Sequence, residues 1–357
     1  MTAILVPHAK LRALVATLFE KAGSPAADAR RVADHLVDAN LAGHDSHGVQ
    51  LVKRYIEHIQ KGLCRPGTKA TCVADKGAVL QFDGGRGFGI CVATEAMTAA
   101  MARCATTGIV LMTLRNAHHI GRVGAYAEMA LAQGLISIHF VNVTDHPPMV
   151  APFRGRDARF GTNPVCIGIP GTARSPALLL DMATSAVAVG KVVVAKQAGQ
   201  PVPENAVIDA QGQPTTDPAR YFGPPQGALL PFGLHKGYGL MLAAEILAGV
   251  MSGNGTIQPG TPRLGSIMNN MFSIVIDPAQ LADPAWAGGE LDALIAYLKA
   301  APTQDGAPVL VAGEPEAATR REREAKGIML PSGTVAELEA AVALVGLKAE
   351  QVRGIGV

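Results

Sequence analysis

The sequence predicts an α+β fold in which helices from both ends of the chain flank a central region of strands and helices. Apolar residues recur at helical spacing over about the first 60 residues, and the end of the chain returns to that spacing. From Arg65 onward, short β-like apolar runs alternate with apolar helices. A chain of 357 residues with 48% apolar and 17% charged residues can bury a large core.

Three helices with short connections are expected at the N-terminal end. The first spans residues 8–23, where apolar side chains recur every three or four positions and a glycine follows. The second uses Ser24 as its N-cap and Pro25 as its first position, and runs to about Leu41. The third spans about 46–61. Together they predict a small helical layer.

The central region should contain eight strands separated by four apolar helices. The strands are expected at 68–75, 78–82, 108–114, 135–142, 164–169, 177–181, 272–276 and 308–312. The helices are expected at about 90–106, 121–133, 184–198 and 236–251. Near the C-terminus, Thr334 and Glu337 have the spacing of a capping box, and 319–327 is a charged, solvent-facing turn or helix.

Charge and cysteine usage narrow the function class and the compartment. With 31 basic and 29 acidic residues interspersed, the net charge of +2 gives no reason to expect nucleic acid or an anionic membrane as partner. The five cysteines lack C-x-x-C spacing, as is typical of reduced thiols in a reducing compartment. No apolar run is long enough for a signal peptide or a bilayer span, so we expect a cytoplasmic protein.

A Rossmann domain is not expected, because neither glycine-rich run completes a dinucleotide fingerprint. The first has Gly85 and Gly87 but Ile90 at the third glycine position. The second has Gly237 and Gly239 but then Leu242. Neither follows a good strand with an acidic residue about 20 positions later, as a ribose contact requires. A nucleotide would have to be held in another way.

The densest chemical segment is His44-Asp45-Ser46-His47-Gly48. An imidazole titrates near neutrality, and a neighbouring hydroxyl or carboxylate can fix its tautomer, which suits acid/base catalysis. The alternative is that Asp45 or Ser46 only caps a helix and His47 is an incidental first-turn residue. The residues alone leave these two interpretations open.

Three more segments place polar residues and glycines at the start of helices. They are 116–122, with His118, His119 and Arg122; 181–185, with Asp181 before Thr184 and Ser185 and with Lys191 further on; and 235–239, with His235 and Lys236. Each can be a capped turn, and the segment 116–122 can be one with a single buried histidine. Together the segments predict a site built from helix N-termini around a polyanionic ligand.

These segments, in this order, resemble the malate/L-lactate dehydrogenase family of non-Rossmann oxidoreductases. The matching stretches are SHGVQLVKRY, NAHHIGRVGAYAEMA, RFGTNPVCIGIP, LLLDMATSAVAVGK, PTTDP, HKGYGLMLAAEILAG and AGEPEAATRREREAKGI. The resemblance implies a homodimer with a helical domain from both chain ends (1–70 and 283–357). It also implies a non-Rossmann nicotinamide-binding domain (71–282) whose sheet is largely antiparallel. The implied reaction is hydride transfer between NAD or NADP and a small 2-oxo or 2-hydroxy acid.

The resemblance also implies roles for individual residues. His47 would be the proton donor, with Ser46 beside it and Asp181 as the third member of a relay. Thr162 would contact the substrate. The implied coenzyme contacts, including those that the helix N-termini suggest, are His47, His119, Gly121, Arg122, Val123, Leu179, Leu180, Asp181, Met182, Ala183, His235, Lys236, Asn269, Gly313, Glu314 and Pro315.

One residue departs from the family pattern. Many members have an arginine three residues after the glycine of SHG, where it can pair with a substrate carboxylate, and this chain has Leu51 there. Either Arg54 or Arg122 takes over the carboxylate, or the pocket is more apolar and admits a bulkier 2-oxo acid. We favour a bulky or aromatic acid such as phenylpyruvate, hydroxyphenylpyruvate or 2-oxoglutarate, with Arg122 as the anchor.

Other functions remain alternatives at this point. The same family reduces cyclic imine acids and also contains malate/L-lactate-type dehydrogenases. A metal-dependent hydrolase could use His44, Asp45 and His47 with His118 or His119, but no H-E-x-x-H or carboxylate-rich spacing is present and no metal site is predicted. A binding protein without catalytic activity is the third class.

Overall fold

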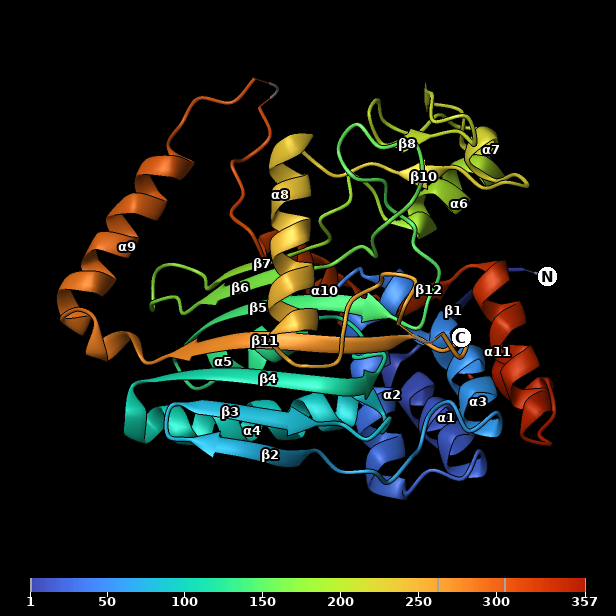
Figure 1. Cartoon of the computed structure of the whole chain (residues 1–357), viewed down its shortest axis with the longest axis horizontal. Coiled ribbons are helices and arrows are strands. Elements are labelled where there is room, and N and C mark those ends of the chain that lie inside the picture. The colour runs from blue at the N-terminus through green and yellow to red at the C-terminus, as the bar shows by residue number, and fades with distance from the viewer. Residues whose placement is uncertain (1, 262, 305, 357) are drawn as a thin grey trace.

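The computed structural model of the chain describes residues 2–261, 263–304 and 306–356. Its centre is a seven-stranded sheet with the order β2-β3-β4-β11-β5-β6-β7 (Figure 1). The strands are β2 Thr71–Lys76, β3 Val79–Asp83, β4 Ile109–His118, β5 Ile136–Thr144, β6 Val165–Ile169, β7 Leu178–Met182 and β11 Met268–Ile276. Among these described strands β3 and β4 alone pair in parallel. The predicted α+β class with a largely antiparallel, non-Rossmann sheet is confirmed.

Helices cover both faces of this sheet (Figure 1). Helices α4 (Gly89–Thr107) and α5 (Gly124–Leu131) lie behind it and bury their apolar side chains in the core between helix and sheet. In front, α8 (His235–Ala244) crosses the sheet and continues as a π-helix over Glu245–Val250. A sheet buried on both faces needs nearly continuous apolar strands, which is the pattern of 109–114 and 271–276.

The helical layer is built from both ends of the chain, as predicted. Helices α1 (His8–Lys21), α2 (Ala26–Leu41) and α3 (Val52–Gln60) share one apolar core with α11 (Ser332–Leu344) and α12 (Glu350–Arg353). Strand β1 (Ile4–Val6) pairs with β12 (Ile328–Leu330), which joins the two chain ends directly. The charged segment 319–327 lies mostly in helix α10 (Glu314–Lys326), as expected.

Several predicted details are wrong. Pro25 occupies the N-cap position of α2, and the buried hydroxyl of Ser24 has no hydrogen-bond partner in the described structure. The third helix begins at Val52, because 45–51 form two 3₁₀ turns instead (η1 Asp45–His47 and η2 Val49–Leu51). Helix α11 starts before Thr334 and has no side-chain cap, so the capping box is absent. Residues 308–312 are not a strand.

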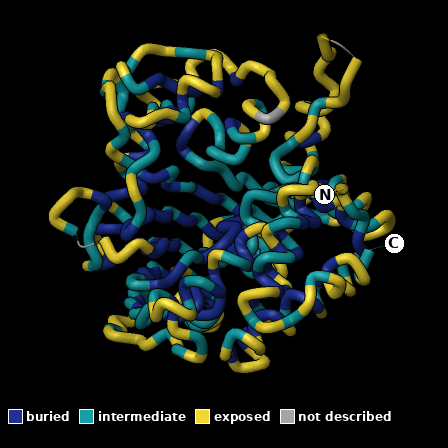
Figure 2. The backbone as a smooth tube through the Cα atoms, turned by 90° about the vertical axis from the view of Figure 1, so that its right-hand side faces the viewer, coloured by how far each residue is buried: buried dark blue, intermediate teal, exposed yellow. Residues whose placement is uncertain are grey.

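The remaining elements lie around the sheet. A three-stranded sheet of β8 (Val207–Ile208), β9 (Pro214–Thr215) and β10 (Ala228–Leu229) lies with α6 (Val189–Ala198) and α7 (Pro218–Tyr221) above the main sheet (Figure 1). Exposed backbone concentrates in these upper segments and in the lower turns, whereas the middle layers are buried (Figure 2).

Helix α9 (Pro284–Lys299), preceded by the short turn η4 (Pro278–Gln280), lies on the opposite side of the molecule from α11 and the other helices of the N-terminal layer (Figure 1). None of its described side chains belongs to the core of the helical layer. The predicted division into 1–70 with 283–357 and 71–282 therefore stays a prediction. No helix in the described ranges has the length and hydropathy needed to cross a membrane.

Candidate active site

His47 lies in the 3₁₀ turn η1, which side chains from distant segments hold in place. The Asp45 carboxylate accepts hydrogen bonds from Arg323 of α10 at 2.7 and 3.0 Å and from Asn40 of α2 at 2.5 Å. Asn40 also accepts from the backbone N–H of Val49 at 2.9 Å. Asp45 is thus committed to a bidentate ion pair, and the turn has no side-chain cap. The interpretation of Asp45 or Ser46 as a helix cap is wrong.

The His47 ring is oriented by two neighbours. The Ser46 hydroxyl and Nδ1 of His47 are 3.1 Å apart, within hydrogen-bond distance. On its face, His47 stacks on His119 with ring centroids 5.8 Å apart and an interplanar angle of 18°. Burial, together with the charges of His44 and Arg122, lowers the pKa of His47 to about 4. His47 is therefore a neutral imidazole at neutral pH, held by Ser46 as predicted.

Both His118, at the end of β4, and His119, directly after it, form side-chain hydrogen bonds, and of the two only His118 is buried. Nδ1 of His119 is hydrogen-bonded to the Tyr55 hydroxyl at 2.5 Å. Nε2 of His118 is hydrogen-bonded to Nδ1 of His58 at 2.8 Å, and His118 is fully buried. Tyr55 and His58, which lie three residues apart in α3, reach this pair of histidines, although nothing local in the sequence indicates these contacts.

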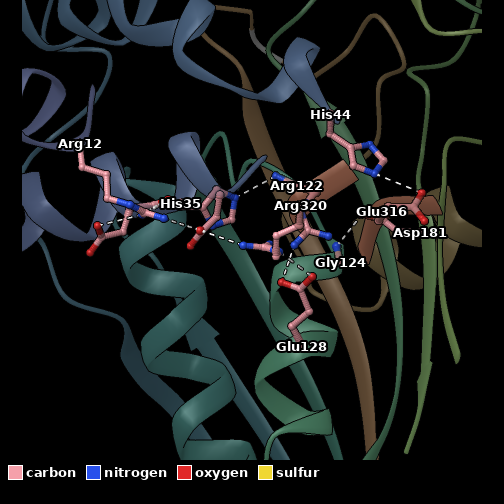
Figure 3. A network of polar contacts seen from close by, with 11 residues as sticks. Arg12, His35, His44, Arg122, Gly124, Glu128, Asp181, Glu316 and Arg320 are labelled. Carbon is pink, nitrogen blue, oxygen red and sulfur yellow. Dashed lines mark hydrogen bonds and ion pairs between the residues drawn. The ribbon is translucent and has the colours of Figure 1, made fainter. Parts of the chain in front are cut away.

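Arg122 is a buried cation beside this group. Its guanidinium is 2% exposed and pairs with Glu128 of α5, while its Nε and Nη1 atoms have no hydrogen-bond partner in the described structure (Figure 3). Its backbone N–H donates to Nε2 of His35 at 2.9 Å. Gly121 makes this contact possible, because its φ is +73° and a Cβ there would lie 2.2 Å from Nε2 of His35.

Asp181, at the end of β7, binds a backbone N–H rather than His47. Its Oδ2 accepts from the backbone N–H of Gly124 at 2.7 Å (Figure 3). Burial raises the pKa of the Asp181 carboxyl, and the charge of Arg122 opposes that rise. Among the described residues Asp181 and His47 share no hydrogen bond, so the third position in the relay stays a prediction without a contact to support it.

Ion pairs connect this region to the helical layer. Arg12 of α1 and Arg320 of α10 both bind Asp38 of α2, at 2.6 and 3.2 Å (Figure 3). Arg320 also lies 3.9 Å from Glu128, the partner of Arg122. A chain of alternating charges thus runs from α1 to α5. Its members come from four separate segments, so no local pattern in the sequence predicts it.

Several predicted coenzyme and substrate residues meet at the ends of β6 and β7. The carbonyl of Thr162 accepts from the backbone N–H and the hydroxyl of Thr184, both at 2.9 Å. The backbone N–H of Leu179 donates to Ala312 at 3.0 Å, which places Gly313, with φ +98°, directly against Leu179. The structure therefore joins the predicted segments 179–183 and 313–315.

Asn269 lies in β11 and supports the turn that carries Gly121, Arg122 and Val123. Its Oδ1 accepts from the backbone N–H of Ile120 at 3.0 Å, and its Nδ2 donates to the carbonyl of Asn142 at 3.0 Å. This buried amide fixes the turn from inside the sheet.

Glu314 is the first residue of α10. Its carboxylate accepts a hydrogen bond from the backbone N–H of Val311 at 2.8 Å and pairs with Lys299 at the end of α9.

Other predicted residues lie apart from this cluster. His235 and Lys236 are exposed at the start of α8, and the loop before them reaches the cluster where the backbone N–H of Phe232 donates to the Thr184 carbonyl at 3.1 Å. Leu51 packs in the core of the helical layer and is 9% exposed, so it contributes little to any pocket wall. Arg54, in contrast, is exposed and lines a cavity of about 210 Å³.

The site fits an anionic nucleotide better than it fits a metal ion. The two unpartnered N–H-bearing atoms of Arg122 are buried donors that still need an acceptor. Gly121 and Gly313 have positive φ angles, a backbone conformation that favours glycine. The backbone at these two positions therefore carries no side chain that would block a ligand. Within the described ranges no group of three or more His, Cys, Asp or Glu side chains is arranged to hold a metal ion.

Comparisons with known proteins point to one family. A sequence profile of the malate/L-lactate dehydrogenase family matches residues 6–339. Hydroxycarboxylate dehydrogenase B of Escherichia coli K12 is 44% identical over 326 residues, which are 91% of this chain and 90% of that protein. An L-lactate dehydrogenase of Cupriavidus necator is also 44% identical, over 84% of this chain and 86% of its own length.

Solved structures agree with the sequence matches. A candidate malate/lactate dehydrogenase from Escherichia coli superposes with a TM-score of 0.93 and 41% identity over 98% of both chains. Malate dehydrogenase from Pyrococcus horikoshii gives a TM-score of 0.85 and 31% identity over 97% of both chains. Δ1-piperideine-2-carboxylate reductase from Pseudomonas syringae gives a TM-score of 0.81 and 26% identity, over 95% of this chain and 99% of its own.

Proposed function

Since the chain belongs to the malate/L-lactate dehydrogenase family and catalyses the oxidoreduction of 2-hydroxy acids, we propose that it reduces a 2-oxo acid with NADH or NADPH. The observation that carries the proposal is the environment of His47. Its ring is fixed by Ser46 at 3.1 Å and by the stacked His119, and it is neutral near pH 7. A fixed, titratable imidazole is the group that ketone reduction and alcohol oxidation require.

His47 acts as the acid/base. In the oxidising direction the neutral imidazole takes the proton of the substrate hydroxyl. In the reducing direction the imidazolium gives a proton to the oxygen of the former ketone, whose developing negative charge needs it. Ser46 keeps the tautomer and the orientation of the ring. The nicotinamide, when bound, carries the hydride to or from the carbon next to the carboxylate.

The coenzyme is proposed to lie along the joined segments of the site. Its contacts would come from His47, His119, the turn from Gly121 to Val123, the strand end from Leu179 to Ala183, His235 and Lys236 of α8, Asn269, and Gly313 to Pro315. Two backbone hydrogen bonds support this, because one joins Thr184 to Thr162 and the other joins Leu179 to Ala312. The unpartnered donors of Arg122 support it as well. The coenzyme can be NAD or NADP.

Arg122 is proposed to anchor the carboxylate of the 2-oxo acid, with Thr162 beside the substrate. The substrate is proposed to be larger than pyruvate, with phenylpyruvate, hydroxyphenylpyruvate and 2-oxoglutarate as candidates. The cavity beside Arg54 supports this, because its volume of about 210 Å³ leaves room for a side chain. Leu51 is buried and does not line this cavity.

A second candidate is the reduction of a cyclic imine acid. It is favoured by the structural likeness to the Δ1-piperideine-2-carboxylate reductase of Pseudomonas syringae, whose name contains such a substrate. Both reactions add hydride to a carbon that bears a carboxylate, so they can share one site.

A panel of 2-oxo acids and cyclic imine acids with each coenzyme separates the two candidate reactions, with consumption of the reduced coenzyme as the readout. We expect turnover of 2-oxo acids to exceed that of cyclic imines. Faster reduction of cyclic imines would assign the second function, and turnover of neither class would contradict the proposal.

We also propose a cytoplasmic homodimer. Helix α9 carries large apolar side chains that are exposed in the single chain, namely Trp286, Leu294, Tyr297 and Leu298. Contiguous exposed apolar surface is typical of protein contacts. All five cysteines are free thiols, which suits a reducing compartment. Light scattering should give twice the 36.9 kDa mass of one chain, and a monomer would contradict the dimer.

A further inference from the structure

We propose that Arg323 of α10 is a positioning residue for His47, and that α10 is the element that holds the acid/base turn in place. The inference rests on the proposed function, because it concerns the residue that carries the proton in that reaction. The charged segment 319–327, which the sequence predicted only as a solvent-facing turn or helix, would then have a role in turnover.

Helix α10 has no apolar anchor. Its apolar residues are three alanines and one proline, and none of its 13 residues, all of which the structure describes, is buried. A helix that is polar on all sides is held by ion pairs and hydrogen bonds rather than by an apolar stripe. Such contacts have defined directions, so they fix the orientation of the groups that they join.

One face of α10 lies against the segment that leads into His47. After the first helical residue, the partly buried residues recur three or four positions apart, which places them on one face. They are Glu316, Thr319, Arg320 and Arg323. Glu316 lies 3.6 Å from Nε2 of His44 (Figure 3). A Cβ on Gly43 would lie 3.2 Å from Cγ2 of Thr319. The helix therefore contacts the chain directly before the acid/base turn.

Arg323 makes the closest contact of this face. Its guanidinium donates to both carboxylate oxygens of Asp45, at 2.7 and 3.0 Å, and also to the carbonyl of Asn40. A bidentate pair between a guanidinium and a carboxylate fixes an orientation as well as a distance. Asp45 lies two residues before His47 in the same 3₁₀ turn. Arg323 therefore fixes the N-terminal side of that turn.

The Asn40 side chain holds the other side of the turn. Its Nδ2 donates to Asp45 at 2.5 Å, and its Oδ1 accepts from the backbone N–H of Val49 at 2.9 Å. Gly48 permits this close approach, because a Cβ there would lie 2.3 Å from Oδ1 of Asn40. The chain is thus held on both sides of His47 by residues that the same guanidinium binds.

The first turn of α10 is tied to the proposed coenzyme segment by other contacts. Gly313 is the N-cap of the helix, and the backbone N–H of Leu179 donates to the carbonyl of Ala312 at 3.0 Å. This hydrogen bond does not involve Arg323. Loss of the Arg323 side chain should therefore release the turn that carries His47 while it leaves the coenzyme segment in place.

The alternative is that the charges of α10 only keep a surface helix solvated. The opposite face fits that description, because Glu322 and Lys326 are exposed and form an i,i+4 ion pair at 3.0 Å, a kind of pair that contributes little. Arg321 is exposed as well and pairs with no acidic residue in the described part of the chain. Arg323, in contrast, is partly buried and binds a residue 278 positions away.

The test compares Arg323→Gln with Arg321→Gln, the matched control, on whichever of pyruvate, phenylpyruvate and 2-oxoglutarate the wild type reduces fastest. Arg323→Gln should lower kcat by about 10- to 100-fold, because His47 would no longer be held at the reacting distance. Coenzyme affinity, measured by fluorescence titration, should stay near that of the wild type. Arg321→Gln should keep both values. Arg323→Lys should recover part of kcat, since lysine keeps the charge but not the bidentate geometry.

A double-mutant cycle measures whether Arg323 acts through Asp45. In an Asp45→Asn background, Arg323→Gln should cost much less than it does in the wild type, because the ion pair is already broken. If circular dichroism shows that Arg323→Gln does not fold, Arg323→Lys and Asp45→Asn serve for the same comparison of kcat with coenzyme affinity.

A normal kcat in Arg323→Gln, or an equal loss in Arg321→Gln, would overturn the inference. So would a loss of coenzyme affinity in proportion to kcat, or an equal cost of Arg323→Gln in the two backgrounds. These results leave the proposed function intact, because the wild type would still reduce 2-oxo acids. If the wild type reduced none of the three acids with NADH or NADPH, the proposed function itself would fail.

Discussion

The His47 imidazole is neutral at physiological pH, because burial disfavours its charged form. The SHG segment made it a candidate, and the structure supplies the contacts that the sequence left open. Its partners are the adjacent Ser46 and His119, which lies 72 positions further along the chain. Tyr55 and His58 could not be predicted, because nothing local to α3 shows which residues of β4 they meet.

The lowered pKa of His47 predicts different pH profiles for the two directions. Oxidation needs the neutral imidazole, which dominates above a pKa of about 4, so kcat/KM for oxidation should be level from pH 8 down to about pH 5. Reduction needs the imidazolium, whose fraction rises about tenfold for each unit by which the pH falls towards that pKa. Its kcat/KM should rise accordingly over the same range.

The measurement uses a 2-oxo acid and its 2-hydroxy acid, neither of which titrates between pH 5 and pH 8. A profile for reduction that is level below about pH 6.5, the ordinary pKa of histidine, would show that burial does not shift His47 in the working enzyme.

At the scale of elements, most helices and strands follow from apolar periodicity, and the errors lie at their boundaries. The third helix was placed too early, because Gly48 and the Asp45–Arg323 ion pair convert its expected first turns into 3₁₀ turns. The strand predicted at 308–312 is irregular, although Leu179 does bond to Ala312. Apolar content alone does not distinguish a strand, which makes a regular series of hydrogen bonds, from an irregular segment that makes a single one.

The turn that carries Arg122 gives a test at this scale. Gly121→Ala should lower coenzyme affinity and turnover, because its Cβ would lie 2.2 Å from Nε2 of His35 and displace the Arg122 backbone. Gly134→Ala is the matched control, since its φ of +71° is close to the +73° of Gly121 but nothing lies within 4 Å of its Cβ.

Both variants should lose about 1–3 kcal/mol of stability from the left-handed backbone conformation. Gly121→Ala alone should lose function. Equal activity of the two variants would show that the His35 contact does not position the site.

For the whole molecule, composition and periodicity predicted the α+β class but not the order of strands. Strand β11 follows β5 by more than a hundred residues and still lies between β4 and β5. Long-range pairing of this kind leaves no local signal in one sequence. The family resemblance supplied the largely antiparallel sheet, and the ion-pair chain from Arg12 to Glu128 could be read only from the structure.

Buried neutral histidines predict how stability depends on pH. His35, His118 and His139 are buried, and their pKa values fall to about 3 from an ordinary value of 6.5. The unfolded chain binds these protons and the folded one does not, so the free energy of unfolding falls as the pH drops from about 6.5 towards 3. Each such histidine contributes about 1.4 kcal/mol per pH unit. The raised pKa of Asp181 acts in the opposite direction.

Urea unfolding at several pH values measures this slope. His139 lies outside the site and contacts only Ser137 and Ser273 through its ring nitrogens. His139→Asn should therefore reduce the slope by roughly the contribution of one histidine while keeping turnover. An unchanged slope in that variant would contradict the assignment.

Turnover and coenzyme binding of His47→Ala, measured side by side, test the central claim most directly. If His47 is the acid/base of a 2-oxo acid reductase, turnover should fall by about two to four orders of magnitude. Coenzyme affinity, measured by fluorescence titration, should stay near that of the wild type, because most proposed contacts lie elsewhere. Near-normal turnover in His47→Ala would contradict the claim.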